Sequence, residues 1–166
     1  YLLTANDKLY ALTLDGTLTA YNDNAMEEVA GTYNVGEISP KGTKAVIAAD
    51  TNGDLYVCKG ENGISKVAAD GTASKFFECP TFKAPVNADK TGDVKGCANG
   101  VCVSGNYVYV ACGSYGLVVL DKTGKQVCHR KAYNGKSANF VTVKDGKIFV
   151  AYGQSRVQVF ALATTK

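Results

Sequence analysis

The stretch that decides the fold is residues 105–125, GNYVYVACGSYGLVVLDKTGK. It contains a turn, a short run of β-branched and aromatic residues, a second turn and a second such run. Similar stretches occur at residues 6–22, 53–72 and 145–162. Short runs of this kind, separated by Gly, Asn and Asp, are typical of β-hairpins. Their repetition along the chain predicts a β-propeller or a related repeat fold.

The spacing of the repeats supports this prediction. The first run of each repeat is centred on one apolar residue, and successive centres lie 46, 53 and 40 residues apart: Leu9, Leu55, Val108 and Ile148. A propeller blade of four strands needs about 40–50 residues. The longest spacing includes residues 80–96, which contain two prolines. Because proline lacks an N–H donor, we expect an extra loop there rather than a central strand.

Counting strands within each repeat shows that the last one is shorter. The first three repeats contain four strand candidates each: 2–5, 8–14, 17–21 and a ragged one within 28–34; 44–49, 54–59, 64–69 and 73–79; 100–104, 107–113, 116–122 and 125–131. The last contains three: 139–143, 147–152 and 157–162. Little or no helix is expected, and the best helix candidate is residues 24–30. The sequence therefore predicts one all-β domain, a β-propeller or partial propeller of about four blades of four-stranded antiparallel sheet, with the last blade incomplete. The repeats cover about 1–40, 41–94, 95–135 and 136–166.

An incomplete last blade leaves open sheet edges, which proteins normally protect. The chain begins at Tyr1 rather than Met, so we expect a mature or excised piece of a longer precursor. Three arrangements fit these observations. The chain is part of a larger propeller, or it closes as a small ring, or two copies pair edge to edge.

Composition narrows the classes of partner. The chain is 46% hydrophobic and 20% charged, with a net charge of +3 and its basic residues scattered among acids. This argues against nucleic acid as a partner. No apolar run is long enough to span a membrane. The six cysteines contain no closely spaced pair, so we expect no zinc site. We expect mostly buried thiols, with the disulfides of an exported protein as the alternative.

The best repeat resembles the LVIVD repeat, in which a strand of type YVYVA precedes a Gly-containing turn and a strand of type LxIxD. Here the second strand reads LVVLD, residues 117–121, and looser copies are ISKVAAD at 64–70, VQVFAL at 157–162 and LTAYND at 18–23. The resemblance implies a β-propeller of a bacterial protein that is exported, either to the cell surface or to the periplasm. It implies no catalytic residues.

The sequence DTNGD has the spacing of oxygen ligands in a calcium loop, supplied by Asp50, Asn52 and Asp54. The interpretation that we favour is a hairpin turn, because a β-rich run follows directly and Asn and Gly accept turn conformations. No cofactor is expected, and calcium remains the alternative at these three residues.

Aromatic residues recur at one position of the repeat. Tyr10, Tyr56, Tyr109 and Phe149 each follow the central apolar residue, and we interpret them as packing between blades. Three other tyrosines lie at or near turns and are candidates for a recognition surface: Tyr115, Tyr133 and Tyr152.

No nucleophile, base or acid is arranged in a catalytic pattern. The only histidine, His129, adjoins Cys128, and neighbours on a strand point to opposite faces. We therefore expect a non-enzymatic recognition or scaffold module that binds a protein or glycan. The alternative is an enzyme whose site lies in the central channel and is not recognisable from sequence.

Overall fold

The computed structural model confirms the all-β fold class. It describes residues 1–22, 24–41, 46–84, 92–153 and 156–161. Within these ranges the regular elements are strands, apart from one 3-10 turn, η1 (Tyr133–Gly135). None of the described residues forms a helix that is long and apolar enough to cross a membrane.

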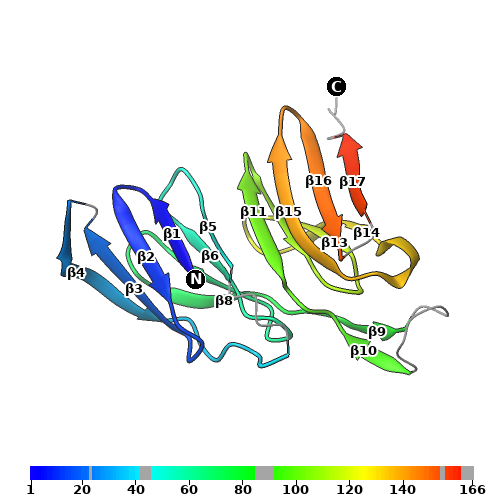
Figure 1. The fold of residues 1–166 in the computed structure, drawn as a ribbon, viewed down its shortest axis with the longest axis horizontal. Coiled ribbons are helices and arrows are strands. Elements are labelled where there is room, and N and C mark those ends of the chain that lie inside the picture. Colours follow the sequence, from blue (N-terminus) through cyan, green and yellow to red (C-terminus); the bar gives the residue numbers. More distant parts are fainter. Residues whose placement is uncertain (23, 42–45, 85–91, 154–155, 162–166) are drawn as a thin grey trace.

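Apart from one two-stranded hairpin, the described strands form four antiparallel sheets, which we call blades 1 to 4 (Figure 1). Blade 1 contains β1 (Leu2–Ala5), β2 (Lys8–Leu12), β3 (Thr17–Asn22) and β4 (Ala25–Asn34). Blade 2 contains β5 (Ile47–Ala49), β6 (Leu55–Cys58), β7 (Ile64–Val67) and β8 (Ala73–Phe77). Blade 3 contains β11 (Gly100–Ser104), β12 (Tyr107–Ala111), β13 (Leu117–Asp121) and β14 (Gln126–Arg130). Blade 4 contains β15 (Ala138–Lys144), β16 (Lys147–Tyr152) and β17 (Arg156–Ala161). Within each blade, each strand pairs with the next along the chain.

Two segments differ from simple blade strands. The predicted extra loop contains a separate hairpin of β9 (Thr81–Lys83) and β10 (Asp93–Lys95), and Pro85 lies outside the described residues. The helix candidate at residues 24–30 was wrong. Those residues belong mostly to β4, which pairs with β3 through two register shifts.

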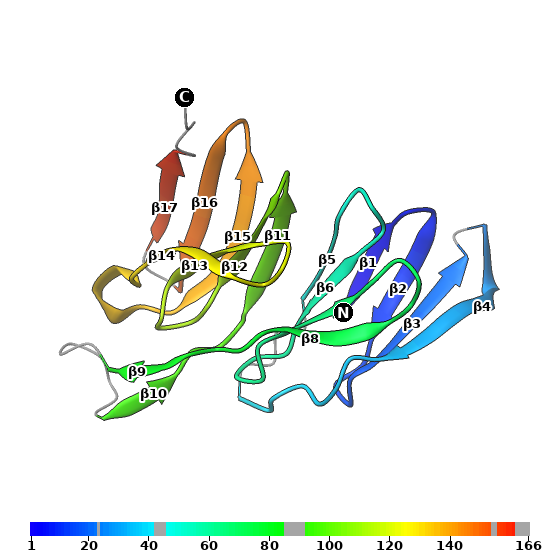
Figure 2. The same cartoon turned by 180° about the vertical axis from the view of Figure 1, so that it is seen from behind.

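The blades stack face to face in chain order. Contacts join the innermost strands β1 with β5, β5 with β11, and β11 with β15. Figures 1 and 2 show blades 1 and 4 on one side of the molecule and blades 2 and 3 on the other. The described residues form three buried apolar clusters, one between each pair of successive blades. The molecule is therefore an open arc of four blades held by three interfaces.

The recurring aromatic position lies in these interfaces. Tyr10 is buried between blades 1 and 2, Tyr56 between blades 2 and 3, and Tyr109 between blades 3 and 4. The preceding residue of each strand points to the opposite face, because side chains alternate along a strand. Burying an aromatic side chain contributes roughly 1.5–3 kcal/mol. The predicted packing role is confirmed for these three residues.

Close backbone approach requires glycine in the turn between the second and third strands of a blade. Gly63 and Gly116 occupy this turn in blades 2 and 3, with φ of 78° and 108°. A Cβ on Gly116 would lie 2.1 Å from the carbonyl oxygen of Arg130, and one on Gly63 would lie 2.1 Å from that of Phe77. Each turn therefore packs directly on the backbone at the end of the fourth strand.

We expect Gly116→Ala to lower the free energy of unfolding by at least about 2 kcal/mol, because it adds both a steric clash and an unfavourable φ. Gly105→Ala is the matched control. Gly105 also has a positive φ, but nothing lies within 4 Å of its Cβ position, so its cost is about 1 kcal/mol. Urea unfolding followed by circular dichroism measures both, and equal losses would contradict the close approach.

Candidate functional site

A groove of about 570 Å³ opens between blades 3 and 4. Strands β12, β13 and β14 form one wall, and β16 and β17 form the other. The sheet alternation of blade 3 places one set of side chains in this wall. Leu117 lies opposite Arg130 and Val119 lies opposite Cys128 across β13 and β14, so these residues share one face.

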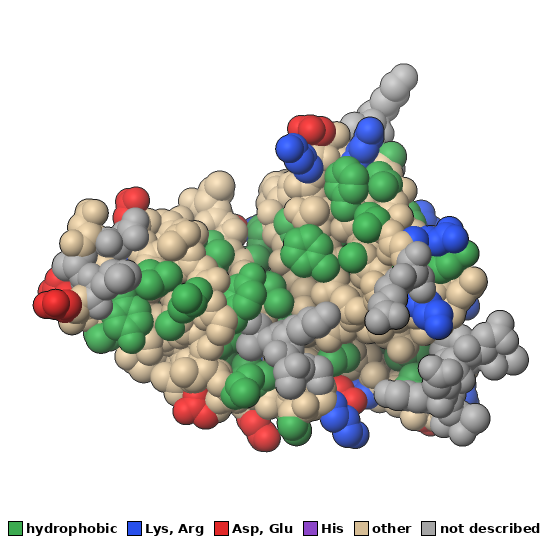
Figure 3. Space-filling model, in the orientation of Figure 1, with side chains coloured by type: hydrophobic (Ala, Val, Ile, Leu, Met, Phe, Trp, Pro, Cys, Tyr) green, Lys and Arg blue, Asp and Glu red, His purple; other side chains and the backbone are tan. Residues whose placement is uncertain are grey.

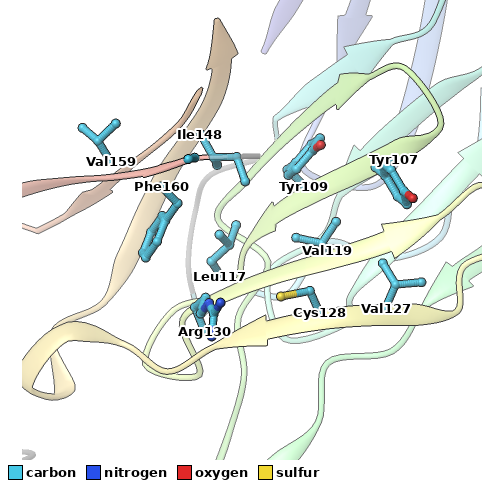
Figure 4. Close-up of a pocket in the computed structure, with 11 residues that line it drawn as sticks. Tyr107, Tyr109, Leu117, Val119, Val127, Cys128, Arg130, Ile148, Val159 and Phe160 are labelled. Atoms are coloured by element: carbon cyan, nitrogen blue, oxygen red, sulfur yellow. The ribbon is translucent and has the colours of Figure 1, made fainter. Parts of the chain in front are cut away.

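The lining of the groove is mainly apolar. Figure 4 shows Leu117, Val119 and Cys128 on blade 3, with Phe160 of blade 4 across from them. Tyr107 and Tyr109 lie at one end of the groove, with ring centroids 6.5 Å apart in an edge-on arrangement. An apolar cavity with a few polar groups is typical of a binding site.

The ionisable groups of the groove do not form an acid–base pair. Among the described residues that line it, these groups are Tyr107, Tyr109, Cys128 and Arg130. Burial and the neighbouring Cys102 and Tyr107 raise the pKa of Tyr109, so its hydroxyl stays neutral at physiological pH. No salt bridge found among the described residues includes Arg130. The groove therefore offers apolar contacts, two phenols and one cation.

The edge of blade 4 borders this groove. In blades 1 to 3 the third strand pairs with a fourth, whereas the described part of blade 4 ends with β17, which pairs only with β16. The fourth strand normally helps to fill the space between blades. In blade 2, Phe76 on β8 packs edge-on against Tyr56, with centroids 5.0 Å apart. The groove lies beside β17, where a fourth strand of blade 4 would pack.

The three tyrosines predicted to form a recognition surface have different surroundings, and Tyr133 packs against the buried cluster that contains Tyr152. Tyr115 is half-buried and stacks on His129 with centroids 3.9 Å apart, while the Tyr115 carbonyl oxygen lies 2.8 Å from His129 Nε2. Tyr133 is half-buried in η1, and the Arg156 guanidinium lies 4.1 Å from its ring centroid. His129 is therefore half-buried against Tyr115.

Tyr152 is completely buried in the cluster between blades 3 and 4. It therefore does not belong to an exposed recognition surface. The physical reason is alternation within β16: Ile148, Val150 and Tyr152 all point toward blade 3. Burial raises the pKa of its hydroxyl.

The DTNGD segment has the geometry of a hairpin turn. One oxygen of Asp50, Oδ1, accepts hydrogen bonds from the amides of Asn52 and Asp54 at 2.9 and 3.0 Å. The other, Oδ2, forms a 2.8 Å salt bridge with Lys122 of blade 3. Asp54 pairs with Lys66 of its own blade. Both carboxylates are therefore neutralised by lysines, and the described residues contain no cluster of three or more His, Cys, Asp or Glu that could hold a metal.

The salt bridge between Lys122 and Asp50 links blades 2 and 3 and changes the pKa of Asp50. Burial of Asp50 disfavours its charged form, but the hydrogen bonds from Lys122 and from the amides of Asn52 and Asp54 outweigh this effect. The pKa of Asp50 is therefore held below its usual value. The resulting stabilisation is present above the usual aspartate pKa and is lost as the pH falls through the lowered value.

We expect Lys122→Met to lower the free energy of unfolding by about 1–3 kcal/mol at neutral pH, because it leaves a buried carboxylate without its cation. The difference from the unmodified protein should shrink when the pH is taken from neutral to below the lowered pKa of Asp50, because the carboxyl is then neutral in both proteins. Lys125→Met, at an exposed position outside the salt bridges found, is the control. Urea unfolding at both pH values measures the effect, and a loss that does not depend on pH would contradict it.

Buried thiols account for part of the core. Cys58, Cys79 and Cys112 are buried and form no disulfide. The Cys112 thiol donates a hydrogen bond to Cys79 Sγ at 3.6 Å. This bond and burial raise the pKa of Cys112, which keeps it protonated. These three cysteines therefore serve as small core residues.

The groove residues Val127, Arg130 and Phe160 were not found by sequence reasoning. Each belongs to a predicted strand, but no local signal shows that they share a cavity. The available signal was indirect: the sequence pattern predicted three strands in the last repeat and four in each of the others.

Comparison with known proteins places the chain in a family. A family model described as "Domain of unknown function (DUF5074)" matches residues 1–165. No curated protein matches the sequence significantly. The structure is similar to the crystal structure of the computationally designed Ika4 protein, with a TM-score of 0.71, 10% identity, and coverage of 98% of this chain and 89% of that chain.

Two longer chains are also similar. One belongs to the crystal structure of the mitotic checkpoint complex, with a TM-score of 0.71, 13% identity, and coverage of 98% of this chain and 48% of that one. The other is BamB from Moraxella catarrhalis, with a TM-score of 0.52, 14% identity and coverage of 96% and 42%. The chain spans less than half the length of these two chains. At such identities the similarities show a propeller-like fold, and the family match shows that the chain belongs to the DUF5074 family.

Proposed function

We propose that this protein is a non-enzymatic recognition module that binds an extended segment of a partner protein in the groove between blades 3 and 4. The observation that carries the proposal is that β17, which pairs only with β16 among the described strands, lies beside an apolar groove. An open strand edge presents backbone N–H and C=O groups that a second strand satisfies. A bound segment would add to β17 as the fourth strand of blade 4.

The groove has the features that strand addition uses. Main-chain hydrogen bonds supply affinity in this mode of recognition, and pockets for alternate side chains supply specificity. The mouth of the groove exposes Tyr107 and Val127, and its floor contains the buried Leu117 and Tyr109. Apolar side chains at alternate positions of the segment fit this lining. An acidic side chain suits Arg130.

The side chains that line the groove favour a peptide over a glycan as the ligand. Glycan sites combine aromatic faces with many hydrogen-bonding groups, and the polar side chains that line this groove are Tyr107, Tyr109, Cys128 and Arg130. An enzymatic site in the central channel remains the alternative, without a residue set to support it. An exported location, at a bacterial surface or in the periplasm, is part of the proposal and is supported by the LVIVD resemblance.

A phage-displayed library of ten-residue peptides, selected on the immobilised protein, tests the proposal. We expect enrichment of sequences with alternating apolar residues and at least one acid, because these match the groove. The enriched peptides are then synthesised and their Kd is measured by calorimetry. We expect Val127→Arg to weaken binding at least about tenfold, because it places a bulky cation at the groove mouth.

Leu14→Arg is the matched control. Leu14 is 65% exposed and Val127 is 50% exposed, so both substitutions leave the core intact, but Leu14 lies in the turn between β2 and β3, outside the groove. The proposal fails if no peptide is enriched. It also fails if Val127→Arg and Leu14→Arg bind the selected peptides equally well.

A further inference from the structure

In the part of the chain that the structure describes, each of the two end blades has one apolar sheet face that no other blade covers. In blade 4, one set of alternate residues faces blade 3, and the other set faces away: Phe140, Thr142, Phe149, Ala151, Val157 and Val159. In blade 1, the set facing away from blade 2 includes Leu2, Leu9, Ala11, Tyr21 and Val29. We call these sets the blade 4 end face and the blade 1 end face. Apolar patches of this kind mark interaction sites.

The two end faces are the two halves of one repeated interface. At each interface between successive blades, the recurring aromatic residue of one blade packs toward the next blade. The central apolar residue of that next blade, which is aliphatic, packs toward the first. Tyr56 of blade 2 and Val108 of blade 3 lie in the same cluster, as do Tyr109 and Ile148 at the next interface. On the blade 4 end face the aromatic position is Phe149, and on the blade 1 end face the aliphatic position is Leu9. A blade 4 end face is therefore suited to pack on a blade 1 end face.

Charge supports the same pairing. Residues 1–34 contain five acidic residues and one lysine, a net charge of −4. Residues 136–161 contain three lysines, one arginine and one aspartate, a net charge of +3. In Figure 3, acidic side chains border the blade 1 half of the view, and most basic ones lie over and beside the other half. Opposite charges steer the two faces together and disfavour pairing of like faces.

The described residues leave parts of both end faces exposed. Leu2 is 65% exposed and Phe140 is 54% exposed within the single chain. Both end blades lie on the side of the molecule that faces the viewer in Figures 1 and 3, and hydrophobic side chains appear there on both halves. The arc also aligns over nearly its whole length with less than half of two longer chains. Figure 1 shows the two end blades on the same side of an open arc.

We propose that the occupant of these faces is a second copy of this chain, and that two copies form a closed, two-fold symmetric ring of eight blades. The blade 4 end face of each copy packs on the blade 1 end face of the other. A contact between two different faces closes after two copies when the rotation is half a turn. Both end faces of both copies are then buried, and the groove at β17, which shares Val159 with the blade 4 end face, otherwise lies on the opposite face of the sheet.

Sedimentation velocity of the 166-residue chain, over a range of concentrations, tests the proposal. We expect a species of twice the chain mass that dissociates on dilution and weakens as salt rises, because part of the attraction is electrostatic. Leu2→Lys changes only the blade 1 end face, and Phe140→Asp changes only the blade 4 end face. Each should raise the Kd of the dimer at least about tenfold.

Mixing the two variants distinguishes this arrangement from other dimers. One interface of the mixed pair combines two unmodified faces and the other combines Lys with Asp, so we expect the mixture to dimerise more tightly than either variant alone. Leu14→Asp, equally exposed in a turn, is the control and should leave the Kd unchanged. Circular dichroism verifies that each variant is folded.

Three outcomes would overturn the proposal. The first is a chain that stays monomeric at all concentrations, which would point to further blades of a longer polypeptide or to another protein as the occupant. The second is a dimer weakened by only one of the two substitutions, which indicates pairing of like faces. The third is a mixture that associates no better than its components. None of these measurements depends on a peptide in the groove, so the proposed function is tested separately.

Discussion

Face-to-face packing of blades is the constraint on which the rest of this structure depends. A sheet blade alone has two faces and cannot bury either without a neighbour. Blades 2 and 3 bury both faces in apolar clusters that contain Tyr56 and Tyr109, whereas blades 1 and 4 bury one face each. Removal of apolar surface from water is the main stabilising contribution. It is therefore obtained on both faces of the middle blades and on only one face of each end blade.

Blade 4 contains both surfaces for which a partner is proposed. One is its end face, formed by alternate residues of β15, β16 and β17, and the other is the edge of β17, which borders the groove against blade 3. The surfaces are distinct because Phe140 and Phe160 point to opposite faces of the same sheet. Self-association through one surface and peptide binding through the other are therefore compatible, and a ring would present two grooves.

Sequence reasoning was most accurate where local pattern and tertiary context agree. All four strands of blade 3 were predicted to within two residues at each end, because turns at Gly105 and Gly124 delimit runs of strongly β-forming residues. It was wrong at residues 24–30, where Ala, Met and Glu favour helix but pairing with β3 overrides this preference. The groove could not be predicted, because its walls come from repeats 3 and 4 and no local pattern encodes their separation.

The sequence by itself determined most of the blade strands, their order and the alternation of their two faces. These depend on turn chemistry and on period-two patterning within a hairpin, which act over a few residues. The tertiary structure decided which face is covered, how the arc curves and which distant residues meet. Asp50 and Lys122, for example, are 72 residues apart in sequence and join blades 2 and 3. The reason is that the angle between blades results from the packing of side chains on different repeats, and this packing exists only once the blades are stacked.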